Sequence, residues 1–433
     1  MPKLTTYGRF FQPAQPSAPA SADKVNCLCY NGHMEQKQIV IVGGGFGGIK
    51  AALELANQTA FKVTLITPEP YFQYYPGLYH LATGGLSSEV RIPLDNIFAR
   101  SRLQVIIGRA ETVDRRARSL TLSDGQVLNY DTLILALGLV TNYFGIEGLE
   151  KFAYGTKSIE EADKLKNHLH DQLINDHAPD MNYVIVGAGP TGIELAGAMA
   201  TYIRRIMKNH GLRQSSVHID LVEAAPRLLP RSPKRVSRAV AAHLKHLGVK
   251  LYLGQAVQGE TADNLTVNGR QLTSHTVVWT AGMALNPFFQ ANHFAIAQHG
   301  KAAVNVYLQA DDDVYIIGDA ANTPYSGMAQ TALYDAVFVA KNLNRQLRGK
   351  KLKPYRPKPP ITVIPAGDHW ASVQWGPLTF SGRLGWWLRE IADLRSFKDY
   401  EPWWRAAEQF LTEFKTEETC SVCQLAEHTY IAD

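Results

Sequence analysis

Short apolar runs and segments with helical spacing alternate along the chain in an order that occurs twice. The run QIVIV at residues 38–42 is followed by a glycine-rich turn, a segment of helical spacing and a second run, FKVTLIT, at residues 61–67. The runs NYVIV at 182–186 and VHIDLVE at 217–223 frame the same arrangement. Continuous β-branched runs are typical of buried parallel strands. The pattern therefore predicts an α/β fold with two Rossmann-like dinucleotide-binding domains.

The first glycine-rich turn satisfies the GxGxxG motif between a strand and a helix. Gly43 permits a tight turn, Gly45 allows the backbone to approach a pyrophosphate, and Gly48 lets the helix pack closely on the strand. The helix N-terminus offers backbone N–H groups and a positive dipole end to the phosphates. Thr67 stands where an acidic ribose ligand is expected, and Glu69, two residues on, is the substitute candidate.

The second turn matches the motif more completely. Gly187, Gly189 and Gly192 take the same three roles, and the following strand ends in Glu223. A carboxylate at this place accepts hydrogen bonds from an adenosine ribose and repels a 2′-phosphate, so NADH is favoured over NADPH. The nearby Arg227 weakens this preference. Two dinucleotide cradles in one chain suggest FAD paired with NAD(P)H.

The composition is that of a globular protein. Of the 433 residues, 45% are apolar and 19% charged, and the formal net charge is +5. This charge is too small to indicate nucleic-acid binding, and no nucleic-acid-binding motif is present. No uninterrupted apolar run reaches the ~18 residues of a membrane-spanning helix. Residues 1–36, rich in Ala, Pro and Ser, are interpreted as a disordered leader.

All four cysteines lie near the two ends of the sequence, at Cys27, Cys29, Cys420 and Cys423. A structural disulfide framework is therefore not expected. Two short cysteine pairs so far apart are a weak indication of a metal site, so free thiols are favoured and no metal is expected. Residues 30–419 contain no cysteine, which argues against flavoprotein reactions that need a redox-active thiol beside the flavin.

Three further segments are predicted strands that turn on glycine: YDTLILALG at 130–138, HTVVWTAG at 275–282 and DDVYIIGDAAN at 312–322. Together with the two cradles they resemble the flavoproteins with two dinucleotide-binding domains. Within that superfamily the chain resembles the type II NADH:quinone oxidoreductases over roughly residues 37–415. The resemblance rests on YPGLYHLATGGLS, TNYFGIEG, KSIEEA, PTGIELAG, LVEAAPRLLP and MAQTALYDAVFVAKNL.

The resemblance implies a domain organisation. An FAD-binding domain would comprise residues 37–152 and 281–345, and an NADH-binding domain would be inserted at 153–280. A C-terminal module, 346–433, follows the Pro- and Lys-rich linker RGKKLKPYRPKPP. Non-covalent FAD and NADH are the implied cofactors. The further cofactor-binding residues would be Gly138, Gly282, Gly318, Ala329 and Asp319, the last bonding the ribityl chain.

The resemblance also implies residues for the reaction. Glu194 would lie near the contact of nicotinamide and flavin, although Thr191-x-x-Glu194 also fits a helix capping box. Gln330 belongs to the family's quinone motif AQxAxQ, whose second glutamine is replaced here by Tyr334. Tyr334 is either a quinone contact or a core aromatic residue. Lys157 is a weaker candidate, because a lysine there more often begins a solvated helix.

The C-terminal region contains two predicted amphipathic helices. Their apolar positions are Leu384, Trp387, Leu388, Ile391 and Leu394 in the first and Trp403, Ala407, Phe410, Leu411 and Phe414 in the second. Four of the seven tryptophans fall between 386 and 404, and Trp favours the membrane–water interface. The alternatives are packing on the core or a dimer interface. Residues 401–418 carry five Glu against one Arg and one Lys, which opposes binding to anionic lipid.

The implied function is NADH:quinone oxidoreduction without proton pumping. Hydride would pass from NADH to FAD, and two electrons would then reduce a membrane quinone. The enzyme would be a peripheral protein of the cytoplasmic face of the cell membrane and a homodimer. The alternatives are a soluble NAD(P)H-dependent ferredoxin or rubredoxin reductase, which also lacks core cysteines, and a non-enzymatic flavin-binding relative.

Overall fold

The computed structural model describes residues 36–175, 179–212 and 217–398. The predicted leader, the four cysteines and the second amphipathic helix lie outside these residues.

A six-stranded sheet forms the first part of the fold. Its strand order is β19-β20-β9-β1-β2-β5, and all neighbours are parallel except β19 and β20. The strands are β1 (Lys37–Val42), β2 (Phe61–Thr67), β5 (Leu103–Ile107), β9 (Thr132–Leu135), β19 (Gln309–Asp311) and β20 (Val314–Ile316). The strand–helix–strand unit predicted around the first cradle is confirmed, with α1 (Phe46–Leu55) between β1 and β2.

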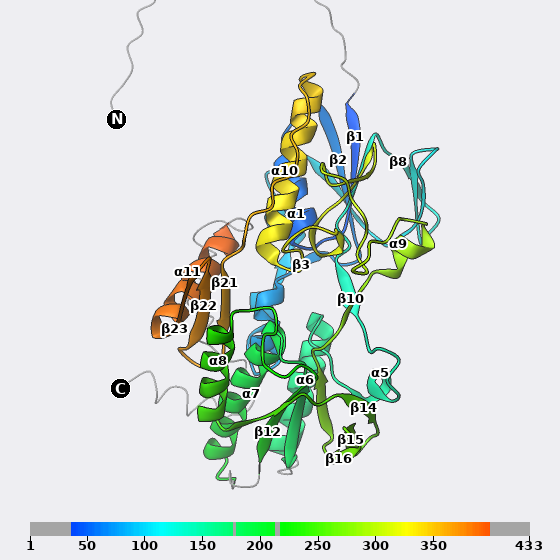
Figure 1. Ribbon diagram of the computed structural model, residues 1–433. Helices are drawn as coiled ribbons and strands as arrows, with labels where there is room; N and C mark the ends of the chain where they lie inside the picture. Colours follow the sequence, from blue (N-terminus) through cyan, green and yellow to red (C-terminus); the bar gives the residue numbers. More distant parts are fainter. Residues whose placement is uncertain (1–35, 176–178, 213–216, 399–433) are drawn as a thin grey trace, which may run out of the picture. The chain divides into compact units, whose positions relative to one another are not determined.

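Each face of this sheet is covered by apolar packing. On one face α1 lies beside α10 (Ala329–Leu347), as Figure 1 shows, and their side chains share a core with Ile39, Ile41 and Leu65. On the other face Val40 and Val42 pack with α9 (Pro287–Ala291) and with strand β7. The antiparallel sheet on this side is β6 (Ala110–Asp114), β7 (Ser119–Leu122) and β8 (Val127–Asn129).

A four-stranded parallel sheet of order β13-β12-β11-β17 forms the second part. Its strands are β11 (Asn182–Val186), β12 (His218–Glu223), β13 (Val249–Leu253) and β17 (Thr276–Trp279). The helices around it are α6 (Ile159–His170), η2 (Asp171–Asn175), α7 (Pro190–Asn209) and α8 (Lys234–His246). A small sheet, β14 (Val257–Glu260), β15 (Asn264–Val267) and β16 (Arg270–Thr273), precedes β17. The second predicted strand–helix–strand unit is thus also confirmed.

The second sheet is inserted between strands of the first. The chain leaves through β10 (Leu139–Thr141) and returns through β18 (Met283–Leu285), and these two strands pair antiparallel. The short helix α5 (Leu149–Phe152), which the sequence analysis gave to the first domain, packs in the core of the second, where Leu149 joins Val184 and Val222. The crossover therefore lies nearer to residue 141 than to residue 152.

Short elements lie along the chain between β2 and β5 of the first sheet. They are β3 (Tyr71–Gln73), η1 (Tyr75–Gly77), α2 (Leu78–Leu81), α3 (Ser87–Val90), β4 (Arg91–Pro93) and α4 (Leu94–Phe98). Strand β3 pairs with β4, and α2 contacts both α6 and α7. This segment therefore links the first sheet to helices of the second.

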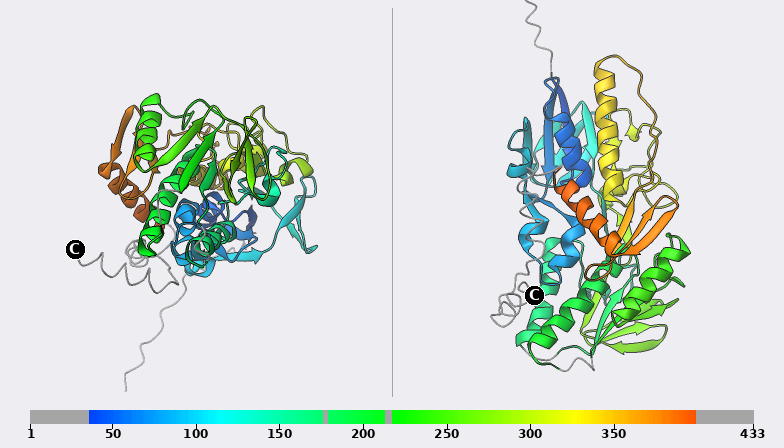
Figure 2. Two further views of the ribbon diagram at one scale, coloured as in Figure 1. Left: turned by 90° about the horizontal axis from the view of Figure 1, so that it is seen from below. Right: turned by 90° about the vertical axis from the view of Figure 1, so that its left-hand side faces the viewer.

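The C-terminal region begins with a sheet that the sequence analysis did not predict. Three antiparallel strands, β21 (Thr362–Pro365), β22 (Ala371–Trp375) and β23 (Leu378–Gly382), precede α11 (Arg383–Lys398). Figure 2 shows α11 lying across these strands, and contacts join it to all three. The first predicted amphipathic helix is thus present. No helix in the described part of the chain is long and apolar enough to cross a membrane.

Candidate active site

The first cradle lies at the carboxyl end of β1. Gly43 adopts a φ of +118°, and a Cβ there would lie 2.4 Å from the carbonyl oxygen of Ala136. A Cβ on Gly48 would lie 1.8 Å from the Gly43 oxygen, so the helix packs against the turn as the motif predicts. Among the residues that the structure describes, nothing lies within 4 Å of a Cβ at Gly45, and no side chain caps the start of α1. The turn therefore leaves space and helix N–H groups for a phosphate.

The second cradle repeats this geometry at the end of β11. Gly187 has a φ of +107°, and a Cβ on Gly192 would lie 1.9 Å from the Gly187 oxygen. Space is open at Gly189, and α7 begins at Pro190 with no side-chain cap. The two turns are thus built alike, although they share little sequence beyond the glycines.

The predicted ribose contacts differ between the cradles. Glu223 accepts hydrogen bonds from the backbone N–H of Ala188 (2.7 Å) and Ala225 (2.8 Å), so its carboxylate orders the second cradle. Thr67 is buried beneath Gly44 of the first cradle, whereas Glu69 is exposed. Their contacts with a ribose remain predictions.

Arg227, which weakened the preference for NADH, is occupied within its own loop. Its guanidinium donates to the carbonyl oxygens of Leu229 (3.0 Å) and Ser232 (2.9 Å) and to that of Pro230. Because these hydrogen bonds occupy the Arg227 guanidinium, they support the preference for NADH over NADPH that was derived from Glu223.

The Gly318–Asp319 turn adjoins the first cradle. A Cβ on Gly47 would lie 3.3 Å from Ile317, the residue before Gly318. The Gly318 N–H donates to Asp335 on α10 at 3.0 Å, while Asp319 accepts from the Gly327 N–H at 3.1 Å. The Gly318–Asp319 turn and the first cradle therefore follow the carboxyl ends of β20 and β1, at one edge of the sheet.

Asp335 is a residue that the sequence analysis missed. It is fully buried on α10, and besides Gly318 it accepts a 2.6 Å hydrogen bond from the Tyr355 hydroxyl. Burial raises the pKa of Asp335 to about 6. The sequence did contain a signal for Asp335, because its carboxylate stands among apolar positions of a helical pattern.

Lys157 lies beside the same edge. Its Nζ is 5.0 Å from the centroid of the Tyr75 ring, and its backbone oxygen accepts from Gln73 at 2.9 Å. Burial lowers the pKa of Lys157, and the charges of Asp319 and Glu161 oppose this. Lys157 is therefore packed between elements of the two domains, contrary to the alternative that it begins a solvated helix.

The predicted quinone residues face the linker before the C-terminal sheet. The Gln330 amide donates to the Ile361 oxygen and accepts from the Ile361 N–H, both at 3.1 Å. The Tyr334 ring centroid is 5.7 Å from that of Tyr355 and 4.6 Å from Lys358 Nζ. These contacts give both side chains a structural role, and their contact with a quinone remains a prediction.

Glu194 lies in the second turn of α7 and meets the C-terminal helix. Its Oε1 is 3.9 Å from a guanidinium nitrogen of Arg389, and their side chains are only 14% and 13% exposed. Burial raises the pKa of Glu194 to about 7; Arg389 opposes this shift and Asp393 adds to it. The capping-box alternative is wrong, because α7 begins after Gly189 without a side-chain cap.

Arg389 also connects Glu194 to the first cradle. It pairs with Asp393, which accepts a 2.6 Å hydrogen bond from the Tyr74 hydroxyl. The Tyr74 ring centroid is 5.9 Å from that of Phe46, the first residue of α1. A continuous set of contacts thus runs from the helix of one cradle to the helix of the other. None of Arg389, Asp393 and Tyr74 was predicted from the sequence to lie at this site.

Helix α11 buries acidic side chains and exposes apolar ones, unlike an ordinary surface helix. Glu390 and Asp393 are only 6% and 7% exposed, whereas Leu384, Trp387 and Ile391 are 65%, 56% and 58% exposed. The polar face therefore packs inward on the site, and the apolar face is exposed. A surface helix of a globular protein ordinarily buries its apolar face and exposes its polar face.

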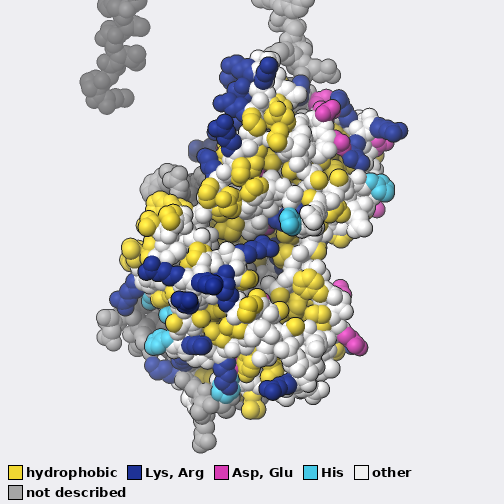
Figure 3. Space-filling view, viewed as in Figure 1, with side chains coloured by type: hydrophobic (Ala, Val, Ile, Leu, Met, Phe, Trp, Pro, Cys, Tyr) yellow, Lys and Arg dark blue, Asp and Glu magenta, His cyan; other side chains and the backbone are white. Residues whose placement is uncertain are grey.

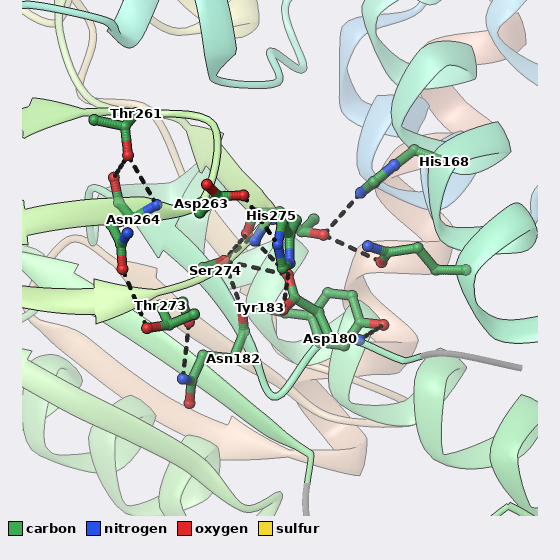
Figure 4. Close-up of polar contacts among 12 residues, drawn as sticks. His168, Asp180, Asn182, Tyr183, Thr261, Asp263, Asn264, Thr273, Ser274 and His275 are labelled. Atoms are coloured by element: carbon green, nitrogen blue, oxygen red, sulfur yellow. Dashed lines mark hydrogen bonds and ion pairs between the residues drawn. The ribbon is translucent and has the colours of Figure 1, made fainter. Parts of the chain in front are cut away.

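A separate polar cluster, drawn in Figure 4, contains Ser274, His275 and Asp180. The His275 N–H donates to Asp180 at 2.7 Å, and the Ser274 hydroxyl donates to the Asn182 oxygen at 2.6 Å. These residues precede or begin β11 and β17, so they lie at the amino ends of the strands. The cradle lies at the opposite, carboxyl ends, which makes this cluster a structural tie between strands.

Comparison with known proteins is consistent with this geometry. A family model described as pyridine nucleotide-disulphide oxidoreductase matches residues 37–336. The type II NADH:quinone oxidoreductase Ndh of Mycobacterium tuberculosis is 29% identical over 399 residues, 83% of this chain and 85% of the relative. The type II NADH:quinone oxidoreductase of Staphylococcus saprophyticus is 24% identical, over 84% of this chain and 95% of the relative.

A solved structure shows the same fold. NDH2 from Plasmodium falciparum, in complex with NADH, matches with a TM-score of 0.80 at 19% identity, over 88% of this chain and 98% of that one. The family match covers well over half of the chain, and the resemblance expected from the sequence is confirmed. The chain belongs to the pyridine nucleotide-disulphide oxidoreductase family, as a relative of the type II NADH:quinone oxidoreductases within it.

Proposed function

We propose that this chain is an FAD-dependent NADH:quinone oxidoreductase, in which bound FAD takes a hydride from NADH and passes two electrons to a membrane quinone without proton pumping. The observation that supports this best is the set of contacts from Phe46 through Tyr74, Asp393 and Arg389 to Glu194. It joins the helices of two dinucleotide cradles, so two bound dinucleotides would meet at one place.

The residues of each cradle fit a dinucleotide. Both turns exclude a Cβ where helix and strand meet and leave open space at Gly45 and Gly189, where a pyrophosphate would approach the backbone. FAD would be held by the first cradle with Asp319, and NADH by the second cradle with Glu223. The assignment of FAD to the first follows from the neighbouring Gly318–Asp319 turn, and that of NADH to the second from the carboxylate at Glu223.

The overall reaction, NADH + H⁺ + quinone → NAD⁺ + quinol, takes up one proton. Glu194 is the group proposed to supply it, because a carboxyl with a pKa near 7 is half protonated at neutral pH. Arg389 holds the Glu194 side chain from α11 and opposes further rise of its pKa. Glu194 is thus the proposed proton donor, and Arg389 is a positioning residue.

Residues 30–419 contain no cysteine, which supports direct transfer to the acceptor. A reaction through a thiolate or a disulfide beside the flavin would need sulfur there. The family name refers to disulphide chemistry, but residues 30–419 of this chain contain no cysteine for it.

Access to a membrane quinone would come through α11. Its inward face holds Arg389 and its outward face presents Leu384, Trp387 and Ile391. An apolar helix face rich in Trp suits the interface of a bilayer. The enzyme is therefore proposed as a peripheral protein of the cytoplasmic membrane face. The expected homodimer remains a prediction that analytical ultracentrifugation would test.

An anaerobic titration tests the function. Purified protein carrying FAD should lose its flavin absorbance on addition of NADH and regain it on addition of a menaquinone or ubiquinone analogue. A ferredoxin or rubredoxin reductase would instead be reoxidised by a small redox protein and not by the quinone. Flavin that stays oxidised in excess NADH would contradict both enzymes and leave only a flavin-binding relative.

A further inference from the structure

Two buried carboxyl groups outside the proposed mechanism each have an oxygen without a hydrogen-bond partner. Glu390, which follows Arg389 on α11, is 6% exposed, and Glu89 on α3 is 7% exposed. Glu390 Oε2 and Glu89 Oε1 have no hydrogen-bond partner among the residues that the structure describes. Burying an ionised carboxyl without a partner is costly, so both positions call for a proton, a water molecule or a function.

His80 on α2 connects these two carboxyl groups. Its Nδ1 lies 3.0 Å from Glu89 Oε2. The charge of His80 also lowers the pKa of Glu390, so the imidazole acts on both carboxyls. The His80 side chain is 28% exposed, whereas that of Glu89 is 9% exposed. His80 is therefore the member of this cluster that can exchange a proton with solvent near neutral pH.

Helix α11 is held against the segment that carries His80. The Arg389 guanidinium donates to the Pro76 carbonyl oxygen in η1 at 3.3 Å, and Asp393 accepts from the Tyr74 hydroxyl at 2.6 Å. The Asp and Glu side chains visible in Figure 3 lie on the opposite side of the view from α11, in agreement with the burial of the acidic residues of this helix. The acidic face of α11 thus meets the His80 segment inside the protein.

The Glu390 carboxyl is placed between opposing charges. Burial raises the pKa of Glu390 to about 7, and the charge of Asp393 adds to this shift. Arg389 and His80, both cations when protonated, oppose it. The remaining titratable groups around this part of α11 are Glu89, Glu194, Tyr74 and Tyr79. Glu390 can therefore both bind and release a proton at neutral pH.

Glu194 is poorly placed to take a proton directly from water. Its side chain is only 14% exposed, and the Arg389 guanidinium 3.9 Å away repels a hydronium ion. Asp393 is the group that the two carboxyls share, because its charge acts on Glu194 and on Glu390. The acidic face of α11 thus offers protonatable groups that end at Glu194.

We propose that His80 and Glu390 form the entry path for the proton that Glu194 donates. Glu89 is a positioning residue, because it holds the His80 ring. A proton leaves the His80 imidazolium and binds to the Glu390 carboxylate. It then passes through Asp393 to the Glu194 carboxylate, and water at the unpartnered carboxyl oxygens completes the hydrogen bonds. Solvent returns a proton to His80, so one proton enters for each NADH oxidised. The inference rests on the proposed function, whose proton it supplies.

The experiment uses the full chain with bound FAD and a soluble short-chain quinone. His80→Gln and Glu390→Gln each remove one titratable group of the entry path. The matched controls, His299→Gln and Glu150→Gln, remove an exposed imidazole and an exposed carboxyl. Flavin content and the thermal midpoint report whether each variant is folded. A pH indicator in weakly buffered solution measures proton uptake, and turnover is measured with and without added imidazole.

The loss should be largest above pH 7, where free protons are scarce. His80→Gln and Glu390→Gln should each lower turnover and proton uptake there by roughly 10-fold, while the controls match the wild type. Added imidazole, a diffusible proton donor, should restore turnover in His80→Gln and in Glu89→Gln, since a merely structural defect would not respond to it. Wild-type turnover in His80→Gln, or a loss that imidazole does not restore, would overturn the proposal.

An infrared titration of the carboxylic acid C=O band tests the cluster without catalysis. The band that the wild type loses as the pH rises through about 7 should lack one component in Glu390→Gln. In His80→Gln the Glu390 component should titrate at higher pH, because a positive charge that lowers the pKa of Glu390 is gone. An unmoved component would overturn the proposed link between His80 and Glu390.

The two levels of the proposal fail differently. A wild type that shows the infrared shift but has no quinone turnover would contradict the proposed function, and the entry path with it. A wild type that reduces quinone while both Gln variants keep its turnover and proton uptake would contradict the entry path alone. Glu194 would then receive its proton by another route.

Discussion

The Glu194 carboxylate on α7 lies 3.9 Å from the Arg389 guanidinium on α11, although 195 residues separate them in the sequence. The pair is largely buried, and Arg389 also pairs with Asp393, which accepts a hydrogen bond from Tyr74. One member belongs to the helix that opens the second cradle, and the other to the C-terminal helix. The pair thus connects the nucleotide site to the part of the chain proposed to meet the membrane.

The first prediction concerns the pH dependence of Glu194. Burial raises the pKa of Glu194 to about 7, so its neutral form, the proton donor, is lost as the pH rises through about 7. Quinone-dependent turnover should fall over that range. Glu194→Gln should lower turnover by roughly 100-fold and remove the inflection near pH 7. The measurement is a pH profile of kcat with a soluble quinone. Unchanged turnover in a folded variant would exclude Glu194 from the mechanism.

The second prediction concerns Arg389. Removing a positive charge from beside a carboxyl raises the pKa of that carboxyl. Arg389→Gln should therefore move the inflection of the pH profile above that of the wild type. Arg389→Lys, which keeps the charge, should return it toward the wild-type position.

The matched control for Arg389 is Arg383→Gln, which removes an exposed arginine from the same helix. It should leave the profile in place. A merely structural role for Arg389 would lower turnover and thermal stability without moving the inflection. That result would contradict the electrostatic role proposed here.

The cradles could be predicted from the sequence because their geometry is local. Gly43 and Gly187 stand at positive φ in turns that directly follow a β-branched strand, and each motif fits within about ten residues. Backbone sterics restrict such positions to glycine whatever the remainder of the chain does. The strand–helix–strand units were therefore accessible without tertiary information.

The partners of Glu194 could not be predicted because their placement depends on distant packing. Arg389 and Asp393 look like the solvated face of an amphipathic helix, and only the contacts with Tyr74 and Glu194 show that this face is buried. The contacts of Gln330 could not be predicted for the same reason. Its amide pairs with the backbone of Ile361, which follows a linker whose sequence has no regular pattern. The strands β21 to β23 are short and only partly apolar, so no periodicity indicated them.

The third prediction separates the two cradles. Gly45 and Gly189 have ordinary backbone angles and open space at the Cβ position, so alanine fits the protein at both sites and meets only a bound pyrophosphate. Gly45→Ala should lower the flavin content of the purified protein. Gly189→Ala should keep flavin and raise the KM for NADH, by roughly 10- to 100-fold. Loss of flavin in the Gly189 variant with normal flavin in the Gly45 variant would reverse the assignment of cofactors.

The fourth prediction concerns stability and Glu260, which lies in β14 and is only 7% exposed. Its Oε2 has no hydrogen-bond partner in the described part of the chain, and burial raises the pKa of Glu260 from 4.5 to about 8. The folded state therefore keeps a proton that the unfolded state loses above about 4.5. Stability should fall as the pH rises from about 4.5 to about 8, by about 1.4 kcal/mol per pH unit at most.

Glu260→Gln removes this linkage, because the amide is uncharged in both states. The variant should match the wild type near pH 4.5 and exceed its free energy of unfolding by a few kcal/mol near pH 8. Urea unfolding at both pH values measures the difference, and the exposed Glu150→Gln is the control for an equal change of net charge. If the Glu260 variant gained no more stability than the control on going to pH 8, the carboxyl would have to be ionised in the fold, with water reaching its Oε2.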